Sequence, residues 1–379
     1  MFFGQYIYIP FVLQACLLSH LAESARPWTC SQGETCVELS RCPILNNVFN
    51  DMTLTTTAQV KYIVARMCHY NPSHINMDLS DRIHVWCPLG DDLRGNILPD
   101  SRTCGQTKGT LRIMSGKEAD LNGFPWIALI LYRHQRTWKP DPTTICAGSL
   151  INSRYVLTAA HCLKGMEVLE KDSMVKSVRL GEHNTATNPD CVTLGNGKRI
   201  CACRHLEVAV EEQIVHEDYV NDGKNINDIA LLRLALPVRY TEAIQPICVL
   251  PGPDYSNHNF VIYWKQQFKI AGWGTSQKQG SHALMQGNIN GSNPIVCQKI
   301  YKTFSFRPES QICAGGQDGT DTCRGDSGGP LMATMGRSVN EFVYLAGITS
   351  YGGHTCGMYP AVYTRTEKFI GWIQRSLRP

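Results

Sequence analysis

The sequence lacks the patterns that would place the protein inside the cell or on nucleic acid. Its 17 cysteines include no Cys-x-x-Cys metal pair, and the only close spacing is Cys201-Ala-Cys203. It has no run of lysine or arginine, and its formal net charge of +4 is small for 379 residues. A basic surface for nucleic acid or anionic lipid is therefore not expected. So many cysteines without metal-type pairs predict a disulfide-bonded extracellular protein.

Long apolar segments are also missing beyond the N-terminus. Residues 1–18 are mostly apolar and small residues follow them, so we predict a signal peptide over residues 1–24. A membrane anchor is the alternative, but the run is shorter than the roughly 20 residues that span a bilayer. It is also broken by Gln14 and His20. We therefore expect secretion, with no membrane partner, and the loss of Cys16 with the signal.

The rest of the chain divides into three regions. Residues 30–88 are short and polar and hold five cysteines, so this region needs cross-links to keep a fold. Residues 89–112 carry Gly, Pro, Asp and Arg without periodicity, which predicts an exposed linker. Residues 113–379 consist of short apolar or alternating runs between turn signals, which predicts an all-β domain. Helical spacing near the C-terminus predicts a last helix that packs through Phe369, Ile370, Ile373 and Leu377.

Three short motifs in the third region carry residue types used in acyl transfer. They are Thr158-Ala-Ala-His161-Cys162, Asn227-Asp228-Ile-Ala-Leu231 and Gly325-Asp326-Ser327-Gly-Gly-Pro330. Each alone has an ordinary structural explanation, such as a turn residue or a tight glycine loop. Together they supply a serine nucleophile, a base with a pKa near neutral pH, and a carboxylate that fixes the tautomer of that base. We predict His161, Asp228 and Ser327 as the catalytic residues.

In this order the motifs resemble those of the chymotrypsin and trypsin family. Further matches extend the resemblance over residues 113–379: Cys146-Ala-Gly-Ser-Leu150, Ala271-Gly-Trp-Gly274 and Pro360-Ala-Val-Tyr-Thr364. The resemblance implies an all-β fold of two six-stranded Greek-key barrels with a C-terminal helix. It also implies that the backbone amides of Gly325 and Ser327 form the oxyanion hole.

The resemblance further implies a pocket for basic side chains. Asp321, six residues before Ser327, matches the acidic base of a trypsin-type pocket. The segment from Ser350 to Gly352 matches the pocket wall and the edge that pairs with the substrate backbone. The chain departs from the family at Ala361, where glycine is usual. We expect its methyl group to narrow the pocket and to disfavour arginine relative to lysine.

Arg112 and Ile113 occupy the place of the family's activation cleavage. By resemblance, a cut after Arg112 frees the Ile113 amine to pair with Asp326, which builds the pocket and the oxyanion hole. Arginine at this site implies that another trypsin-like protease, or the enzyme itself, makes the cut. The uncleaved chain is therefore expected to be a zymogen.

The region of residues 30–88 resembles a clip domain, the small disulfide module that precedes arthropod serine proteases. That module normally ends in Cys-Cys-Pro, whereas this chain has Trp86-Cys87-Pro88, so Trp86 replaces the usual partner of Cys30. The disulfides implied by the two resemblances are Cys36–Cys68, Cys42–Cys87, Cys104–Cys248, Cys146–Cys162, Cys191–Cys201, Cys297–Cys313 and Cys323–Cys356. Of these, Cys104–Cys248 would tether the cleaved light chain to the protease.

These pairs leave Cys30 and Cys203. Either both are free or capped thiols, or they bond to each other and staple the clip domain to the barrel. We expect free or capped thiols, because two cysteines bridge only when their Cα atoms lie within about 7 Å.

Two further features concern modification and metal binding. Asn290-Gly-Ser292 is the only glycosylation sequon, and we expect it on a surface loop. Glu182 lies where some relatives begin a calcium loop, although Cys191 and Cys201 alter that loop in this chain. No cofactor is required for the predicted chemistry, and calcium is kept as an alternative.

The leading hypothesis is an active, secreted clip-domain endopeptidase. By resemblance, such enzymes act in the haemolymph, where they activate prophenoloxidase for melanisation or process a Toll-ligand precursor. The expected partners are that protein substrate, an upstream trypsin-like protease and a serpin inhibitor. One alternative is a digestive protease, against which the clip region and the tether argue. The other is a non-catalytic cofactor.

Overall fold

The structure is a computed structural model of the whole chain. It divides into two compact units, Met1–Asp91 and Asp92–Pro379. The residues that it describes are 36–42, 45–46, 49, 63, 67–70, 77–86, 95–106, 117–193, 195, 197–220, 222, 225–250, 265–274, 282–302, 306–316, 322–323, 325–336, 341–353 and 356–379.

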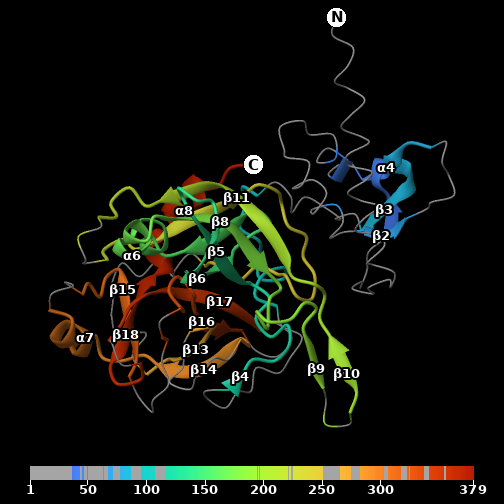
Figure 1. Cartoon of the computed structure of the whole chain (residues 1–379). Helices are drawn as coiled ribbons and strands as arrows, with labels where there is room; N and C mark the ends of the chain where they lie inside the picture. The colour runs from blue at the N-terminus through green and yellow to red at the C-terminus, as the bar shows by residue number, and fades with distance from the viewer. Residues whose placement is uncertain are drawn as a thin grey trace, which may run out of the picture. The chain divides into compact units, whose positions relative to one another are not determined.

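The first half of the larger unit is a closed antiparallel barrel (Figure 1). Its strands in hydrogen-bonded order are β11 (Leu206–Val215), β12 (Ala230–Leu234), β7 (Tyr155–Thr158), β6 (Pro140–Leu150), β5 (Ile127–His134) and β8 (Ser173–Leu180). The apolar runs at residues 126–132, 155–158 and 228–234 lie on β5, β7 and β12, as the sequence pattern predicts. β8 bonds to both β5 and β11, so this barrel has no free edge.

The second half is a seven-stranded antiparallel sheet. Its order is β15 (Gln311–Gly315), β18 (Pro360–Arg365), β17 (Phe342–Tyr351), β16 (Pro330–Met335), β13 (Gln267–Gly272), β14 (Met285–Asn290) and β4 (Lys117–Glu118). A bridge between Gly291 and Ala314 joins the end of β14 to β15, which curls the six strands β13 to β18 toward closure. The prediction of an all-β fold of two barrels is confirmed, with β4 added to the edge of the second.

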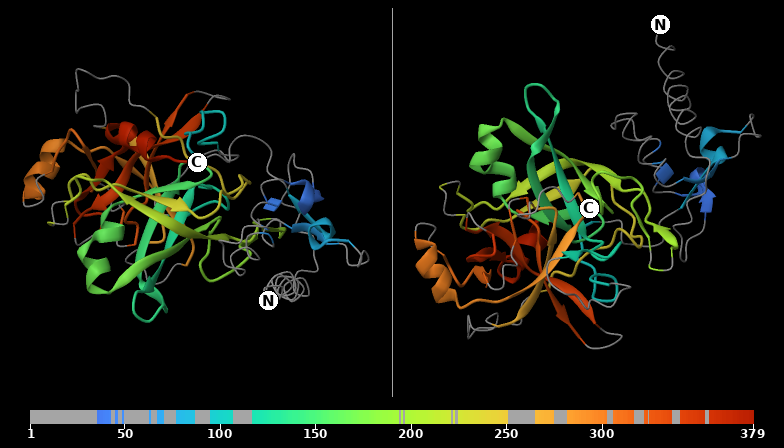
Figure 2. Two further views of the ribbon diagram at one scale, coloured as in Figure 1. Left: turned by 90° about the horizontal axis from the view of Figure 1, so that it is seen from above. Right: turned by 60° about the horizontal axis from the view of Figure 1, so that its bottom comes forward.

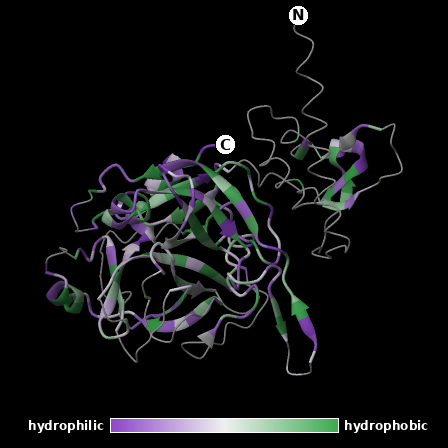
Figure 3. Ribbon diagram, viewed as in Figure 1, coloured by the Kyte–Doolittle hydropathy of each residue, from purple (hydrophilic) through white to green (hydrophobic). Residues whose placement is uncertain are grey.

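The apolar strands of the first barrel share one buried core with the C-terminal helix. Figure 3 shows hydrophobic residues along the strands of the larger unit. A short 3-10 helix, η6 (Thr366–Phe369), leads into α8 (Ile370–Ser376). Phe369, Ile373 and Leu377 are buried in the first-barrel core, and Ile370 packs against it. The predicted terminal helix is confirmed, because the apolar face of this segment has a barrel to cover.

Shorter elements lie between the strands of each barrel. α5 (His161–Lys164) and α6 (Met166–Glu170) follow β7, and α7 (Pro294–Ile300) follows β14. The side chain of Asn293 caps α7 by accepting a hydrogen bond from the amide of Ile295 at 3.0 Å. β9 (Cys191–Thr193) and β10 (Arg199–Cys201) form a separate two-stranded hairpin closed by the Cys191–Cys201 disulfide.

Residues 95–106, within the predicted linker of residues 89–112, are held by contacts with the rest of the larger unit, although residues 97 and 100–102 are exposed. Asn152 donates hydrogen bonds to the carbonyls of Gly95 and Ile97, at 2.8 and 3.2 Å. The Gly105 carbonyl accepts a hydrogen bond from the Val343 amide at 2.9 Å, and the Gly105 amide donates to the Pro246 carbonyl at 2.8 Å. The Cys104–Cys248 disulfide fixes the same segment. The Gly, Pro, Asp and Arg content of this segment predicted that it is exposed to solvent. Its partners Asn152, Val343 and Cys248 lie far along the chain, so composition could not reveal these contacts.

The smaller unit contains a three-stranded antiparallel sheet with β3 (Ile83–Trp86) between β1 (Cys36–Glu38) and β2 (Met67–Tyr70). A 3-10 helix, η1 (Leu39–Arg41), and α4 (Leu79–Arg82) flank it. The Cys36–Cys68 disulfide joins β1 to β2. Ile83 and Val85 are fully buried, so a small apolar core supports the cross-link.

The structure forms six of the seven disulfides implied by the resemblances: Cys36–Cys68, Cys104–Cys248, Cys146–Cys162, Cys191–Cys201, Cys297–Cys313 and Cys323–Cys356. Cys42 is also disulfide-bonded, and Cys87 lies outside the described residues. Cys203 is disulfide-bonded as well, so the expectation of a free or capped thiol there is wrong. The Cα separation that decides bridging is a tertiary quantity that sequence spacing does not supply. Cys30 lies outside the described residues.

Candidate active site

Asp228 and His161 meet between the two barrels. His161 begins α5 directly after β7, and Asp228 lies just before β12, which pairs with β7. The Nδ1 of His161 donates to Asp228 Oδ2 at 2.8 Å, and the His161 backbone amide donates to Oδ1 at 2.8 Å. The Asp228 side chain is fully buried, whereas that of His161 is 20% exposed. The hydrogen bond to Nδ1 therefore fixes the orientation of the imidazole, and Nε2 is left to exchange a proton with a reacting group.

Two residues of the second barrel also hold Asp228. Ser350, on β17, donates from its hydroxyl to Asp228 Oδ2, and Thr364, on β18, donates to the Asp228 carbonyl at 2.8 Å. Sequence reasoning assigned Ser350 only to the pocket wall and missed this contact. A serine hydroxyl can satisfy a buried carboxylate, but no local pattern links residues 122 positions apart.

The charge of Asp228 controls the acidity of His161. Burial disfavours the charged imidazolium, but the Asp228 carboxylate stabilises it through its charge and its hydrogen bond, with a smaller contribution from Glu167. The net effect raises the pKa of His161 above its ordinary value. A raised pKa makes the imidazole a stronger base, which suits it to accept a proton from a hydroxyl.

Ser327 lies in the turn before β16. Its carbonyl accepts a hydrogen bond from the amide of Ala147 on β6 at 2.8 Å, which joins this turn to the first barrel. Gly328 has φ +75°, and a Cβ there would lie 2.4 Å from the Ala147 carbonyl, so only glycine allows this approach. Gly325 has φ +103°. Within the described residues no hydrogen bond joins the Ser327 hydroxyl to His161, an arrangement that apo sites often complete only with substrate.

Asp326 is enclosed beside the serine. Its Oδ1 accepts from the Gly274 amide and its Oδ2 from the Cys323 amide, each at 2.8 Å. A Cβ on Gly272 would lie 2.0 Å from Oδ1, so glycine is needed to make room for the carboxylate. Burial raises the pKa of Asp326 to about 6, although the two amide hydrogen bonds oppose the shift. A carboxylate held in this way is a ready counter-ion for an incoming ammonium group.

The backbone approaches itself closely at Gly352 and Ala361. Ala361, on β18, is 2% exposed. A Cβ built on Gly352 would lie 3.3 Å from the Cβ of Ala361, so the two backbones approach closely. Thr322 shares a 3.0 Å hydrogen bond with the hydroxyl of Tyr363 on the same strand. The Ala361 methyl group therefore faces space already limited by Gly352.

Several predicted residues lie outside the described part of the chain. They are Arg112 and Ile113 of the activation site and Asp321 of the specificity pocket. The structure thus brings together His161, Asp228 and Ser350, and places Ser327 against β6.

The glycosylation prediction does not match the placement of its sequon. Asn290 is the last residue of β14 and pairs with Gln267 on β13. Ser292 is buried, and its hydroxyl donates to the Gly315 carbonyl at 3.0 Å. The sequon therefore lies at a strand end, and the expectation of a surface loop is wrong.

The residues around Glu182 do not fit a calcium ion. The buried Glu182 carboxylate directs Oε2 to Arg179 Nη1 at 3.0 Å and to His205 Nδ1 at 3.1 Å. Asp190 Oδ2 accepts from the amides of His183 and Asn184, at 2.8 and 3.0 Å, and its Oδ1 from the Thr187 hydroxyl at 2.6 Å. Calcium needs six to eight oxygen ligands. Here both Asp190 oxygens already accept hydrogen bonds and Arg179 places a positive charge beside Glu182 Oε2, while Glu182 Oε1 is buried without a hydrogen-bond partner in the described residues.

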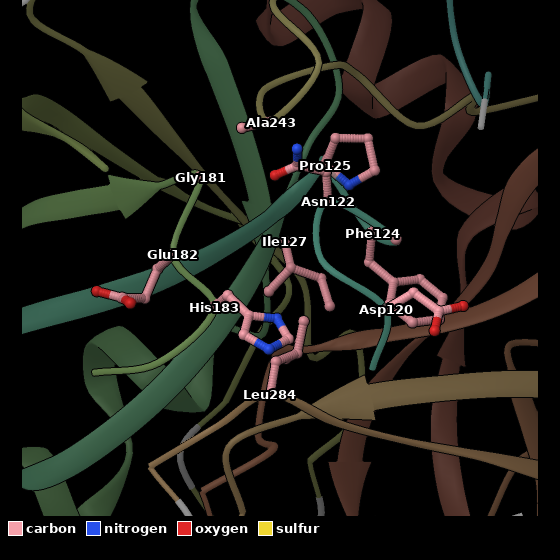
Figure 4. A pocket seen from close by; sticks show the side chains of 11 residues that line it. Asp120, Asn122, Phe124, Pro125, Ile127, Gly181, Glu182, His183, Ala243 and Leu284 are labelled. Atoms are coloured by element: carbon pink, nitrogen blue, oxygen red, sulfur yellow. The ribbon is translucent and has the colours of Figure 1, made fainter. Parts of the chain in front are cut away.

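A shallow pocket adjoins this loop, and its two carboxylates do not converge on a common point where a cation could bind. Figure 4 shows the Glu182 and Asp120 carboxylates pointing away from each other, with His183 between them. Donor atoms of Cys146, His161 and Cys162 also lie close together, but both cysteines are in one disulfide and offer no thiolate.

Comparisons with known proteins agree with this geometry. The profile of the family described as Trypsin matches residues 113–373. The Spaetzle-processing enzyme of Drosophila melanogaster is 39% identical, covering 94% of this chain and 92% of its own length. Phenoloxidase-activating factor 1 of Holotrichia diomphalia is 34% identical, covering 90% and 92%. The crystal structure of the drosophila Grass clip serine protease of the Toll pathway matches with a TM-score of 0.59 at 29% identity, covering 89% of both chains.

Proposed function

The chain belongs to the trypsin family of serine proteases, in its arthropod clip-domain branch, and we propose that it is the zymogen of an active endopeptidase that cuts proteins after arginine or lysine. The observation that carries the proposal is the doubly bonded Asp228–His161 pair. A buried carboxylate that orients an imidazole is the arrangement that activates a serine.

The proposed mechanism gives each residue one task. His161 removes the proton of the Ser327 hydroxyl as the oxygen attacks the scissile carbonyl, and later gives that proton to the leaving amine. Asp228 fixes the tautomer of His161 and stabilises its charged form. The amides of Gly325 and Ser327 then bind the developing oxyanion, a contribution of about 3 kcal/mol per donor.

The specificity proposal depends on Asp321, which provides a carboxylate for a basic substrate side chain. The Gly352–Ala361 approach supports a narrow pocket, which fits the unbranched lysine side chain better than the planar guanidinium. The edge from Ser350 to Gly352 is proposed to pair with the substrate backbone.

Activation is proposed to follow a cut after Arg112. The new Ile113 ammonium then inserts and pairs with Asp326, whose enclosed carboxylate supports this role. The Cys104–Cys248 disulfide keeps the light chain attached after the cut. The cut requires trypsin-like activity, supplied by an upstream protease or by the enzyme itself.

The biological setting is proposed from the relatives. They include a Spaetzle-processing enzyme, a melanization protease and a phenoloxidase-activating factor. We place this chain in an extracellular cascade of the haemolymph, acting on prophenoloxidase or a Toll-ligand precursor under serpin control. In the part of the chain that the structure describes, no helix has the length and apolar content to cross a bilayer.

Covalent labelling tests the proposal. A fluorophosphonate should label the protein stoichiometrically at Ser327 after cleavage at Arg112, and should not label a Ser327→Ala variant. A non-catalytic cofactor, the alternative function, predicts no labelling of the cleaved protein. Incubation of the cleaved protein with candidate precursors then identifies the substrate.

A further inference from the structure

The hairpin between β5 and β6 carries an exposed tryptophan in an unusual conformation. Trp138 has φ +59° and its side chain is 64% exposed. Positive φ is rare for a bulky residue, and exposure of an indole brings no folding advantage. Hydrogen bonds between His134 and the segment Trp138–Lys139 hold the turn, at 2.9 Å each.

The indole is covered on one face by a cation. The guanidinium carbon of Arg133 lies 3.9 Å from the centre of the Trp138 ring. In the described residues Arg133 and Lys139 have no ion pair, and two acidic residues of the adjoining segment are paired with other cations. Asp172 pairs with Arg136 at 2.9 Å, and Glu167 pairs with Lys171 at 2.7 Å. The hairpin therefore presents positive charge without a counter-ion.

This hairpin is joined firmly to the catalytic helix. The hydroxyl of Tyr132, the residue before Arg133, donates to the Cys162 carbonyl at 2.9 Å, and Cys162 is bonded to Cys146 on β6. Cys162 directly follows His161. The hairpin thus has a fixed position relative to the catalytic base.

The tip of the hairpin also rests on the segment after α6. The amide of Gln135 donates to the Asp172 carbonyl at 2.8 Å, and Figure 2 shows the hairpin beside α6 in both views. α6 exposes two large apolar side chains, Met166 and Leu169, each 56% exposed. Cationic and apolar groups therefore share one surface of the first barrel.

We infer that this surface, formed by Arg133, Trp138, Lys139, Met166 and Leu169, is an exosite for an acidic segment of the protein substrate. This exosite role rests on the proposed protease function. A carboxylate of the substrate would form an ion pair with the Arg133 guanidinium. Apolar side chains of the substrate would pack on Trp138 and on the exposed side chains of α6.

The exosite lies on the first barrel, whereas the backbone edge of Ser350 to Gly352 lies on the second. A substrate that pairs with that edge before the scissile bond continues past His161 toward the first barrel. The acidic segment is therefore expected after the scissile bond.

Quenched peptides test the inference with the Arg112-cleaved enzyme. Each peptide has one arginine at the cut and a Glu-Glu or Gln-Gln pair at positions 2–3, 4–5 or 6–7 after it. At one position or more, the Glu peptide should show a kcat/KM about three- to tenfold higher than its Gln partner. Arg133→Gln and Trp138→Ala should remove that preference. Arg102→Gln, which changes the charge equally in the separate Asp100 turn, should keep it.

A tripeptide arginine amide, which has no residues after the scissile bond, should be cleaved equally by all these variants. Loss of that activity in the unmodified enzyme would contradict the protease function itself. Fluorescence anisotropy then measures the affinity of the labelled Glu and Gln peptides for the cleaved Ser327→Ala variant. Because this variant cannot cleave the peptides, the measurement reports binding at the exosite alone. The exosite inference is overturned if Glu and Gln peptides have equal kcat/KM at every position. It is also overturned if the preference for Glu persists in both Arg133→Gln and Trp138→Ala.

Discussion

Asp228 holds His161 by two hydrogen bonds at once, one to the imidazole and one to the backbone amide that begins α5. The carboxylate is also bonded by Ser350 from the second barrel. The catalytic base is therefore positioned by both barrels. Its orientation should be sensitive to changes in either of them.

Removing the charge of Asp228 tests this arrangement. Asp228→Asn should lower kcat on a tripeptide arginine amide by about 10³- to 10⁴-fold, because an amide stabilises the wrong tautomer. Ser350→Ala should cost about tenfold, the effect of one hydrogen bond to a charged group. Equal rates for Ser350→Ala and the unmodified enzyme would show that the Ser350 bond does not position the triad.

The pH profile should report the raised pKa of His161. The base acts only when neutral, so kcat/KM should rise with pH as His161 loses its proton, with a midpoint above the ordinary value of 6.5. Asp228→Asn should move that midpoint downward, because the stabilising charge is gone. Profiles from pH 5 to 9 give both midpoints, and a midpoint at or below 6.5 in the unmodified enzyme contradicts the prediction.

Ala361→Gly should widen the specificity pocket. We expect the ratio of kcat/KM for arginine to lysine peptides to rise by about tenfold, the usual effect of one buried carbon on selectivity. Matched peptide amides that differ only in this residue provide the measurement. An undiminished preference for arginine in the unmodified enzyme would contradict the narrowing by Ala361.

Cleavage at Arg112 should stabilise the protein more at neutral than at acidic pH. In the uncleaved chain the pKa of Asp326 is raised from 3.8 to about 6, so the folded state binds more protons. Stability is then lost as pH rises from about 4 to 6, by on the order of 2–3 kcal/mol. In the cleaved chain the Ile113 ammonium should stabilise the ionised Asp326 carboxylate, so this loss of stability should disappear. The effect should last up to about pH 8, where the amine loses its proton.

Thermal unfolding of cleaved and uncleaved protein at pH 4.5 and 7 measures this difference. The gap in Tm between the two forms should be larger at pH 7. An Asp326→Asn variant should show the same gap at both pH values. A gap in the unmodified protein that does not change with pH speaks against the pairing.

Chelation should leave stability unchanged. Since the Arg179 guanidinium already pairs with the Glu182 carboxylate, we expect EDTA or millimolar calcium to shift Tm by less than about 1 °C. Glu182→Gln should instead destabilise the protein by about 2 kcal/mol, because the Arg179 guanidinium loses its charged partner. A rise of several degrees with calcium would restore the calcium alternative.

Much of the fold followed from residue patterns. The apolar runs predicted β5, β7 and β12, and the helical spacing after Glu367 predicted α8. These predictions succeed because periodicity is a local property that burial on one face imposes. The packing of residues 95–106, the position of the Asn290 sequon at a strand end and the bonded state of Cys203 were not predicted, because each depends on partners distant in sequence.

The sequence by itself determined the family and the chemical identity of the site: a serine, a histidine and an aspartate in ordered motifs, with glycines where the backbone must turn. Only the tertiary structure decided how Asp228 divides its hydrogen bonds between His161 and Ser350, and that Glu182 pairs with Arg179. It alone placed Arg133 over Trp138 on a hairpin fixed to the catalytic helix. Motifs specify which groups are present, whereas ion pairs and hydrogen bonds depend on distances that the packing of the two barrels sets.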